Sequence, residues 1–543
     1  MEQQHIINRD VRKRNVSGKN AELIPAMENL AGRFAAMYNF GCTDGIETLF
    51  MKDGVLELPD FSVRASGREE IRNLFAGRTL KKDTGDIHVL HTPSFAVMNT
   101  DDEAKGTWDT CSYRIYSNEG MPACEIMITR MDVWFAKGED GLKIRSLNWH
   151  IMQSWVPVNY APGQETPLKD LQKKRDFLPE GETPSAGDYT ALQNLLGRFV
   201  HDHFRNPDEL FADRPDTCLF LDCIMEKPAF GFAETAEQME AFIRREKETG
   251  HYMVLCSLAG PVIVLTGENT ARAVSALACY VPTKEKEKEG LYLERSIRLL
   301  KADFVKEEEC WKILSLQTED AAQLPYLPKY TPSFGFERMS LKEGNWTAEE
   351  FGTAQKAGDC SGDAFIAENI VNAWIYATRS GKDMEFLDNY VNFDALPCVF
   401  DFKSRGLDAP SLETEEAIKE KISVFDRQWE ALVKQPAYHA AGTPYVRISA
   451  DGQYMKALWI DCCNTNMSAA FGKYNEDGTV PYMAAVNKYK YEFRKKDGVW
   501  YLVHWYFEPL MNVMQHSFNP KKSRGWCMKD DGRTYQQTEE EYE

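Results

Sequence analysis

Three segments of this 543-residue chain open with the same helical pattern. They read MENLAGRFAAMYNF from Met27, LQNLLGRFVHDHF from Leu192 and AENIVNAWIYATR from Ala367. Each carries apolar residues at the three- and four-residue spacing of an amphipathic helix, and each has an asparagine at its third position. A pattern that recurs along a chain indicates a repeated structural unit, so we predict three copies of one small domain. The shared asparagines are Asn29, Asn194 and Asn369.

A second shared segment lies downstream of each helix. It reads HTPSFAVMNTDDEAKGTWDTC up to Cys111, AGPVIVLTGENTARAVSALAC up to Cys279 and GTPYVRISADGQYMKALWIDC up to Cys462. The three align without a gap, which makes the final cysteines equivalent and brings Trp108 onto Trp459. In each segment two apolar runs flank a turn of polar residues and glycine, which predicts a β-hairpin.

Each copy closes with a strand, a charged turn and a last strand. The copies read VWFAKGEDGLKIRSLNWHI, DFVKEEECWKILSLQTE and EFRKKDGVWYLVHWYFE. The order of helix, strand, helix and then long antiparallel strands predicts an α+β fold. We predict three tandem domains at 20–160, 186–326 and 362–516, followed by a polar tail at 517–543. The segments between the domains are rich in proline, glycine and charge, which is typical of linkers.

The composition narrows the classes of partner and of compartment. The formal net charge is -19 and the sequence pI is about 5.2, which argues against nucleic acid and membrane because both attract basic surfaces. No run of about 18 apolar residues is present, and the first residues lack the apolar stretch of a secretory signal. The 13 cysteines include no CxxC pair. We therefore expect reduced thiols and a cytoplasmic location.

The repeated units resemble SnoaL-like domains of the nuclear transport factor two-like superfamily, over most of the chain. The resemblance implies three tandem cone-shaped domains, each a curved antiparallel sheet packed on N-terminal helices around an internal pocket. Members include isomerases, cyclases and dehydratases that need no cofactor, and also binding domains without chemistry. Related enzymes are trimers of single domains, so a chain with three copies is expected to form an intramolecular pseudo-trimer.

The first copy is most similar to the bile-acid dehydratases of anaerobic gut bacteria. IHVLHTPSFAV from Ile87 resembles their HxxHTP run, whose first histidine is catalytic and corresponds to His88. The third copy has His439 at this position and the second has Cys256. The chain departs from that family on the first helix, where a tyrosine and an aspartate are replaced in every copy. The replacing residues are Phe34 and Asn39, Phe199 and Phe204, and Trp374 and Arg379.

Proton transfer beside a carbonyl, or loss of water, needs a general base and a hydrogen-bond donor for the developing charge. Histidine suits the first role because its ordinary pKa is near neutrality. In the first copy we predict catalytic roles for His88 and His150, on strands that can face one pocket. A histidine hydrogen-bonded in a core is the plain alternative for His88. The predicted ligand-binding residues of this copy are Tyr38, Asn39 and Trp108.

The third copy offers the fullest set of candidate groups. His504, Tyr506 and Glu508 are two residues apart on the closing strand and share one face. With His439 across the sheet, they are predicted to supply a base, an orienting acid and a donor. The predicted catalytic residues are therefore His439, His504 and Glu508. The predicted ligand-binding residues are Tyr376, Trp459, Asp461 and Tyr506.

The second copy lacks the histidine and is predicted to be structural. His201, Asp202 and His203 follow one another on its helix, but no HxxxH or CxxC pattern supports a metal site. No GxGxxG or GxxxxGK loop joins a strand to a helix, so we predict neither a metal nor a nucleotide cofactor.

Two functions remain open from the sequence. The first is a lyase or isomerase without a cofactor, acting on a small hydrophobic ligand that is steroid-like or aromatic. The second is a binding or scaffold protein that has kept the pocket and lost the chemistry. A histidine that meets a tyrosine, aspartate or glutamate inside a closed pocket would favour the enzyme.

Overall fold

The computed structural model describes the chain in segments, and every structural statement below concerns these residues. None of the helices among them is both long and apolar enough to cross a membrane. The described residues are 18–76, 84–97, 102–118, 121–155, 177–202, 219–221, 229–230, short pieces between 234 and 248, 255–283, 292–324, 362–379, 383–402, 410–432, 437–466, 480–518, 527–528 and 534–535.

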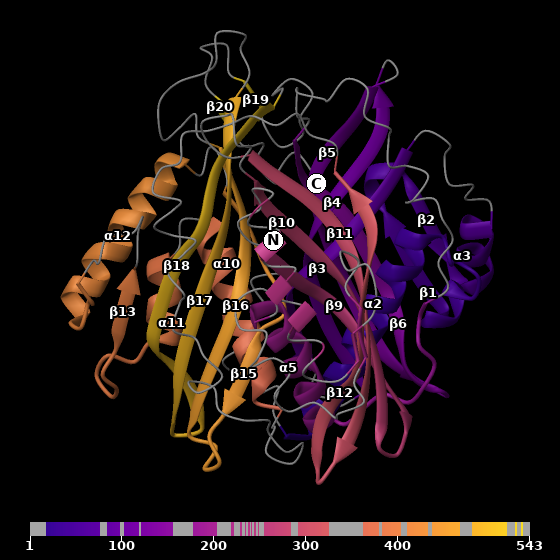
Figure 1. Cartoon of the computed structure of the whole chain (residues 1–543), viewed down its shortest axis with the longest axis horizontal. Helices are drawn as coiled ribbons and strands as arrows, with labels where there is room; N and C mark the ends of the chain where they lie inside the picture. The colour runs from indigo at the N-terminus through magenta and orange to yellow at the C-terminus, as the bar shows by residue number, and fades with distance from the viewer. Residues whose placement is uncertain are drawn as a thin grey trace.

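The first sheet follows a helix that has clear start and stop signals. Pro25 lies in the first turn of this helix, and Gly41 ends it with a left-handed φ of 66°. Four long strands then run back and forth (Figure 1). The elements are η1 (Gly18–Leu23), α2 (Ile24–Phe40), η2 (Ile46–Leu49), β1 (Phe50–Leu58), η3 (Pro59–Phe61), β2 (Val63–Ser66), α3 (Gly67–Ala76), β3 (Thr84–Val97), β4 (Glu103–Asn118), β5 (Met121–Gly138) and β6 (Gly141–Trp155).

The second sheet also follows a capped helix. The Ser185 hydroxyl accepts a hydrogen bond from the Asp188 backbone N–H at 3.2 Å, which satisfies one of the free N–H groups at the helix start. Four strands form most of this sheet. The elements are α5 (Ala186–Asp202), β7 (Leu219–Leu221), β8 (Ala229–Phe230), β9 (Leu255–Gly267), β10 (Thr270–Thr283), β11 (Tyr292–Glu307) and β12 (Cys310–Gln323).

Three helices of the described residues lie beside the third sheet. Its outermost helix begins after Thr414, whose hydroxyl accepts a hydrogen bond from the Ala417 N–H. The elements are α10 (Ala364–Arg379), α11 (Asp383–Tyr390), β13 (Val399–Phe402), α12 (Glu415–Leu432), β14 (Ala437–Ala441), β15 (Tyr445–Ile448), β16 (Tyr454–Asn466), β17 (Val480–Lys496) and β18 (Val499–Phe518), followed by the separate pair β19 (Cys527–Met528) and β20 (Thr534–Tyr535).

The strand orders of the three sheets correspond. They are β2-β1-β6-β5-β4-β3, β8-β7-β12-β11-β10-β9 and β13-β18-β17-β16-β14, with β15 also on β16. The long strands are antiparallel, but β1, β7 and β13 each run parallel to the last strand of their sheet. The expected antiparallel sheets are present, with one parallel strand pair in each. A long connection allows this pairing, and hydrophobic patterns carry no information on strand direction.

The register of the second hairpin overturns one predicted equivalence. The gapless alignment made Cys279 the counterpart of Cys111 and Cys462. The structure shows that it is not. Ile263 faces Ala273 ten residues later, whereas the matching pairs of the other hairpins are eleven residues apart. This hairpin is one residue shorter, which shifts every later side chain by one place. The residues that face one another are His88–Ser112 in the first sheet, Cys256–Cys279 in the second and His439–Cys463 in the third.

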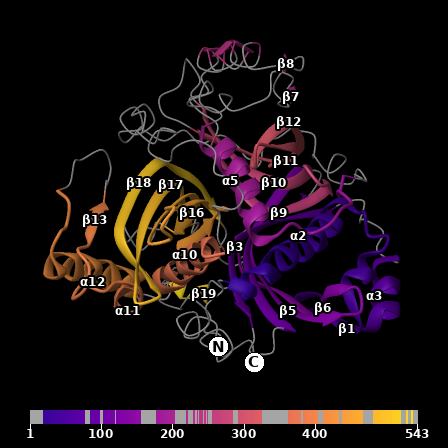
Figure 2. The ribbon, with the colours of Figure 1, turned by 90° about the horizontal axis from the view of Figure 1, so that it is seen from below.

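Each shared asparagine binds a strand of another sheet. Its side-chain amide donates to a backbone carbonyl and its oxygen accepts from the N–H of the same residue. These contacts run from the first sheet to the second, from the second to the third and from the third to the first, and Figure 2 shows the three sheets around a common centre. The pairs are Asn29–Ile263 (2.7 and 2.8 Å), Asn194–Val446 (2.6 and 2.8 Å) and Asn369–Phe95 (3.0 and 2.7 Å). We call them the asparagine clamps.

A glycine lets the first clamp close. Gly32 lies one turn after Asn29, and a Cβ there would be 2.8 Å from the carbonyl oxygen of Gly260 on β9. Such a contact is too short for a carbon atom, so glycine allows α2 to approach the strand closely.

The predicted α+β fold, with helices packed on curved sheets, is confirmed. The predicted domain limits of 20–160, 186–326 and 362–516 remain predictions. Most of the predicted tail at 517–543 lies outside the described residues.

Candidate active site

A buried histidine and aspartate meet in the third sheet. His439 on β14 faces Cys463 on β16, and Asp461 lies two residues earlier on the same face of that strand. The Nδ1 atom of His439 is 2.7 Å from Oδ2 of Asp461, and both side chains are buried. This face of the sheet, which packs on helix α10, is called the inner face. The sequence named both residues but did not predict that they would form a pair.

Neighbouring groups hold this pair in place. The Asn487 amide donates to the same Asp461 oxygen at 3.2 Å, and the Trp374 ring lies 5.5 Å from the His439 ring. On the other side of the imidazole, the Cys463 sulfur is 3.8 Å from Nε2. One ring nitrogen therefore faces the aspartate and the other faces a thiol.

The surroundings favour the charged form of His439. Burial lowers its pKa, but Cys463 and then Asp461 oppose this and raise the pKa well above the ordinary value. Asp461 also acts through a hydrogen bond, because its carboxylate oxygen accepts the Nδ1 hydrogen at 2.7 Å. When protonated, the ring carries a hydrogen on Nε2, which faces Cys463, as well as on Nδ1.

Three more polar atoms on the inner face have no hydrogen-bond partner within the described part of the chain. They are Trp459 Nε1, Asp461 Oδ1 and the Tyr491 hydroxyl, and all are buried. A buried polar atom without a partner is costly, so native proteins satisfy such atoms with water, an ion or a ligand. The Trp374 and Tyr489 rings lie beside them, with centroids 4.8 Å apart. Together they form a polar patch in an aromatic setting.

The first sheet has a different arrangement at the matching place. The His88 Nδ1 atom is 2.6 Å from the Ser112 hydroxyl, which lies 2.8 Å from the Thr110 hydroxyl. A chain of neutral hydroxyls has taken the place of an aspartate. The Thr110 hydroxyl is hydrogen-bonded to the Thr129 hydroxyl, which accepts the indole N–H of Trp149 at 2.7 Å.

The three predicted ligand-binding residues of the first copy have structural contacts. The Asn39 side chain makes two hydrogen bonds with the backbone of His88, at 2.7 and 2.9 Å, and so holds β3 on α2. Tyr38 packs its ring 5.2 Å from the His88 ring. Trp108 lies in the core against Phe95, with ring centroids 5.8 Å apart.

A small cavity touches His88 and Asn39 at the junction of the first and second sheets. Its other walls include Gly260, Ser275 and Leu299, and its volume is about 30 Å³. That volume suits a single water molecule rather than a steroid. In the present conformation, this cavity therefore does not offer the predicted pocket for a large ligand.

His150 does not join His88, contrary to the prediction. The neighbouring Trp149 is the residue that contacts His88, at 4.3 Å between ring centroids, so His150 points to the opposite face. There it lies beside Asn148, and burial, aided by Arg130, lowers its pKa against the effect of Asp132. Alternation along a strand does not reveal which face is covered by helices.

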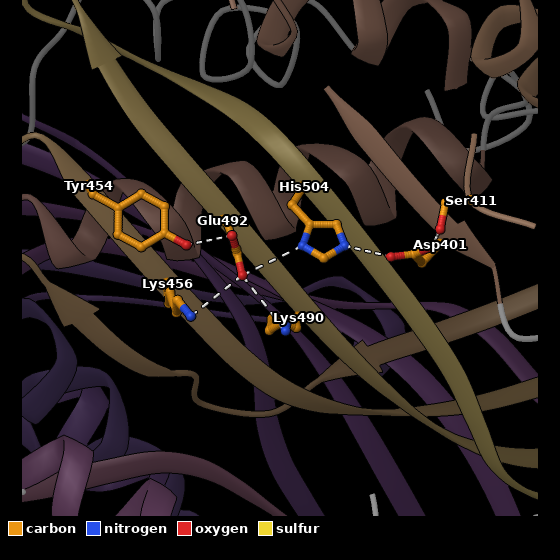
Figure 3. A network of polar contacts seen from close by, with 7 residues as sticks. All are labelled: Asp401, Ser411, Tyr454, Lys456, Lys490, Glu492 and His504. Carbon is orange, nitrogen blue, oxygen red and sulfur yellow. Dashed lines mark hydrogen bonds and ion pairs between the residues drawn. The ribbon is translucent and has the colours of Figure 1, made fainter. Parts of the chain in front are cut away.

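His504 is also on the outer face, away from His439. The next residue, Trp505, packs against Trp374 on the inner side, at 5.5 Å between centroids. His504 instead bridges two carboxylates, with Nε2 2.8 Å from Asp401 and Nδ1 3.5 Å from Glu492 (Figure 3). The predicted set of His439 with His504 is therefore not formed.

The outer network around His504 is a set of ion pairs that joins strands. Lys456 and Lys490 lie 3.6 and 3.7 Å from Glu492, which also accepts a hydrogen bond from Tyr454 (Figure 3). Burial raises the pKa of Glu492, but His504, Tyr454 and Lys456 lower it to about 2. Burial lowers the pKa of His504, but Glu492 and Asp401 outweigh this effect, and the pKa lies above the ordinary value.

The remaining predicted residues of the third copy fall into three groups. The Tyr506 hydroxyl donates to Glu508 at 3.1 Å, so both share the outer face with His504. Trp459 is buried on the inner face, where it stacks on Tyr489. The side chain of Tyr376 lies outside the described residues.

The second sheet holds two thiols at the matching place. The Cys256 and Cys279 sulfurs are 3.1 Å apart and buried. His201 is buried on α5, and no cluster of metal-ligating side chains occurs among the residues that the structure describes. His203 and the side chain of Asp202 lie outside that part of the chain.

Sequence reasoning did not select Tyr489, Tyr491, Cys463 or Asn487 as site residues. A signal existed for the two tyrosines, because they are two residues apart in an alternating strand beside lysines and a glutamate. The alignment singled out Cys462, which lies on the outer face of β16. Its neighbour Cys463 lies on the inner face with Asp461.

The first sheet with its helices carries the features of a known domain type: a long helix, a strand pair, a second helix and a four-strand meander, with a histidine on the first long strand. Residues 20–148 match the family model of the SnoaL-like domain. Members of this superfamily include isomerases and dehydratases without cofactors, and ligand-binding proteins. No curated protein matches the chain.

Several solved structures are similar to parts of the chain. An NTF2-like protein with a cystatin-like fold from Novosphingobium aromaticivorans is 20% identical, with 23% of this chain and 79% of that one covered and a TM-score of 0.20. A hexachlorocyclohexane dehydrochlorinase from Novosphingobium barchaimii is 10% identical, covering 26% and 93%, with a TM-score of 0.23. A ketosteroid isomerase-like protein from Erwinia carotovora is 16% identical, covering 24% and 97%, with a TM-score of 0.20.

Proposed function

We propose that the chain is a lyase without a cofactor that removes water from a small hydrophobic alcohol, either steroid-like or aromatic. The site would be the inner face of the third sheet. The observation that carries the proposal is the buried hydrogen-bonded pair of His439 and Asp461. The surroundings raise the pKa of His439, so that it favours the form that can donate a proton. Buried polar atoms without a hydrogen-bond partner among the described residues lie on the same face.

The proposed reaction begins with the His439 imidazolium. Its Nε2 proton passes to the hydroxyl of the ligand while the C–O bond breaks and its electron pair leaves with the oxygen as water. The neutral imidazole then accepts the proton of the adjacent carbon, and that C–H electron pair forms the double bond. Asp461 keeps the ring oriented and stabilises its charge before and after the step.

The aromatic surroundings suit such a step. Positive charge grows on the carbon that loses the hydroxyl, and the faces of Trp374 and Tyr489 carry partial negative charge that attracts a cation. The same rings would bind a flat hydrophobic ligand. The Tyr491 hydroxyl and the Trp459 indole N–H could then hydrogen-bond its polar groups.

The test is turnover of a panel of hydroxylated steroids, bile-acid derivatives and plant phenolics, with loss of water followed by mass spectrometry. We expect His439→Gln to lower the rate by a factor of about 10² to 10⁴. His504→Gln is the matched control, because it makes the same change on the opposite face of the sheet. A rate that is unchanged in His439→Gln would contradict the proposal.

A binding protein without chemistry is the second candidate. The observation that favours it is the first helix, where Phe34, Phe199 and Trp374 stand in place of the tyrosine expected from the resemblance. In that case a member of the panel would raise the melting temperature by mass action and remain unconverted. Conversion that depends on His439 would exclude this function.

A further inference from the structure

The residues that precede the three clamp asparagines form a second buried polar cluster. They are Glu28 on α2, Gln193 on α5 and Glu368 on α10, with exposed fractions of 2, 4 and 3%. Each occupies the same place on its helix, so the cycle of clamps brings them together. We call this set the helix junction. It shares no residue with the candidate active site.

Hydrogen bonds link the three helices at the junction. The Gln193 amide donates to Oε1 of Glu368 at 2.9 Å, and Tyr189 on α5 lies 3.0 Å from Oε2 of Glu28. Oε2 of Glu368 is buried and has no hydrogen-bond partner among the described residues. A carboxylate ion would therefore leave a buried negative oxygen unsatisfied.

The Tyr189 hydroxyl indicates where a proton belongs. This oxygen is also 3.3 Å from the backbone carbonyl of Pro261, so its single hydrogen faces two acceptors. If Glu28 is ionised, one of these acceptors is left without a hydrogen. If Glu28 is protonated, its O–H donates to Tyr189 and Tyr189 donates to Pro261, and every group is satisfied.

No basic side chain of the described residues compensates the two carboxyls. Burial is the largest cause of both raised pKa values, Glu28 adds to the rise of Glu368, and the hydrogen bonds from Tyr189 and Gln193 oppose it. Other charged groups of these helices have contacts elsewhere. Glu22 binds the Ala186 N–H, Arg33 donates to the Pro179 carbonyl and Asp188 pairs with Lys306.

We propose that Glu28 and Glu368 form a proton-dependent joint between the three helices, closed when the carboxyls are protonated and loosened when they are charged. Two like charges in a buried space without a cation repel one another and cannot be hydrated without separating the helices. The joint would couple the packing of the three sheets to pH. Gln193 marks the one position where the chain has an uncharged side chain of the same shape.

The pKa values of Glu28 and Glu368 agree with this geometry. Burial raises the pKa of Glu28 to about 7, although Tyr189 opposes it, and burial and then Glu28 raise the pKa of Glu368 well above its ordinary value. A carboxyl with a raised pKa stabilises the folded state fully below its unfolded value and ceases to do so as pH rises through the folded value. For Glu28, this window runs from 4.5 to about 7.

The test is the melting temperature of the full chain from about pH 5 to about pH 9, for the wild type and for Glu28→Gln and Glu368→Gln. We expect the wild type to lose stability across this range and each glutamine variant to lose less, with a difference of at least about 2 °C at the alkaline end. Gln193→Glu adds a third carboxyl and should steepen the loss. Glu139→Gln, at an exposed pair with Lys52, should follow the wild type.

An infrared spectrum provides a measurement that does not depend on unfolding. The C=O stretch of a protonated buried carboxyl should be present in the wild type at neutral pH, weaker in each glutamine variant and absent in the double variant. Parallel melting curves for the wild type and the glutamine variants, or the absence of this band in the wild type, would overturn the proposal.

Discussion

Single residues distinguish the matching places of the three sheets. The third sheet combines a histidine with an aspartate, the first combines a histidine with hydroxyls and the second has two thiols. Against the effect of burial, Cys463 and then Asp461 raise the pKa of the neighbouring imidazole in the third sheet. The first sheet has uncharged hydroxyls, Thr110 and Ser112, at the two matching places.

Replacement of Asp461 tests this difference. Asp461→Asn keeps the shape of the side chain but removes its charge, so the pKa of His439 should fall. Because a raised histidine pKa stabilises the folded state at low pH, the variant should also lose stability most at pH values below about 6.5. The ring-proton signal of His439, followed by NMR across a pH titration, measures the shift.

The matched control for this titration is Asp401→Asn. Asp401 makes the corresponding contact to His504 at 2.8 Å on the outer face. This change should lower the pKa of His504 and leave that of His439 where it is. If the pKa of His439 is the same in Asp461→Asn as in the wild type, Asp461 does not stabilise the charged imidazole.

At the scale of secondary structure, the first helices do two tasks. Each covers the inner face of its own sheet, and each binds an edge of another sheet through an asparagine clamp. Both backbone groups of each clamped residue bond the asparagine side chain. The asparagine acts as a neighbouring strand would, because one amide can donate and accept at the same time, which a carboxylate or an ammonium group cannot do.

Removal of one clamp should be costly. Asn369→Ala leaves the N–H and the carbonyl of Phe95 buried without partners, and we expect a loss of about 2 to 4 kcal/mol in the free energy of unfolding. Denaturant unfolding measures this loss.

A weaker asparagine contact provides the comparison. Asn148→Ala removes two long contacts on the outer face, each of 3.3 Å, to Glu57 and to His150, and should cost less than about 1 kcal/mol. Equal losses in the two variants would show that the clamps are not special.

At the scale of the whole molecule, the clamps close a cycle within one chain. We propose that the chain is an intramolecular pseudo-trimer, with the three sheets dependent on one another for burial of their helix faces. One hydrophobic core cluster supports this view, since it includes Phe34 on the helix beside the first sheet, Phe199 on the helix beside the second and Ile460 in the third. Packing thus continues across all three.

Shared packing predicts cooperative unfolding of a monomer. Light scattering should give the mass of one chain, 62.1 kDa, and calorimetry should show a single transition. A variant with all three clamp asparagines changed to alanine should show a broadened or divided transition. Separate transitions in the unchanged protein would contradict the proposed dependence.

Much of the local structure could be read from hydrophobic spacing. The first helices lie where the repeated patterns begin, and the hairpins lie where two apolar runs flank a polar turn. These features depend on neighbours within one segment, so a linear pattern contains them. The one-residue shift of the second hairpin was not predicted, because a gapless alignment assumes that the three hairpin turns have the same length.

The candidate site was predictable only in part. His439 and Asp461 were named from the aligned segments, but their pairing needed the register of β14 on β16. His150 and His504 were misplaced for one physical reason. Alternation along a strand separates two faces, and only the packing of helices decides which face is the inside.

The sequence by itself determined the elements, their order and the recurrence of one helix pattern, because these depend on residues close in the chain. The tertiary structure decided the rest. It placed Asn29 on Ile263, Asn369 on Phe95 and Glu28 near Glu368, across more than 200 residues of sequence. Such contacts arise from the closure of three sheets into a cycle, and no local pattern encodes which distant backbone a side chain will meet.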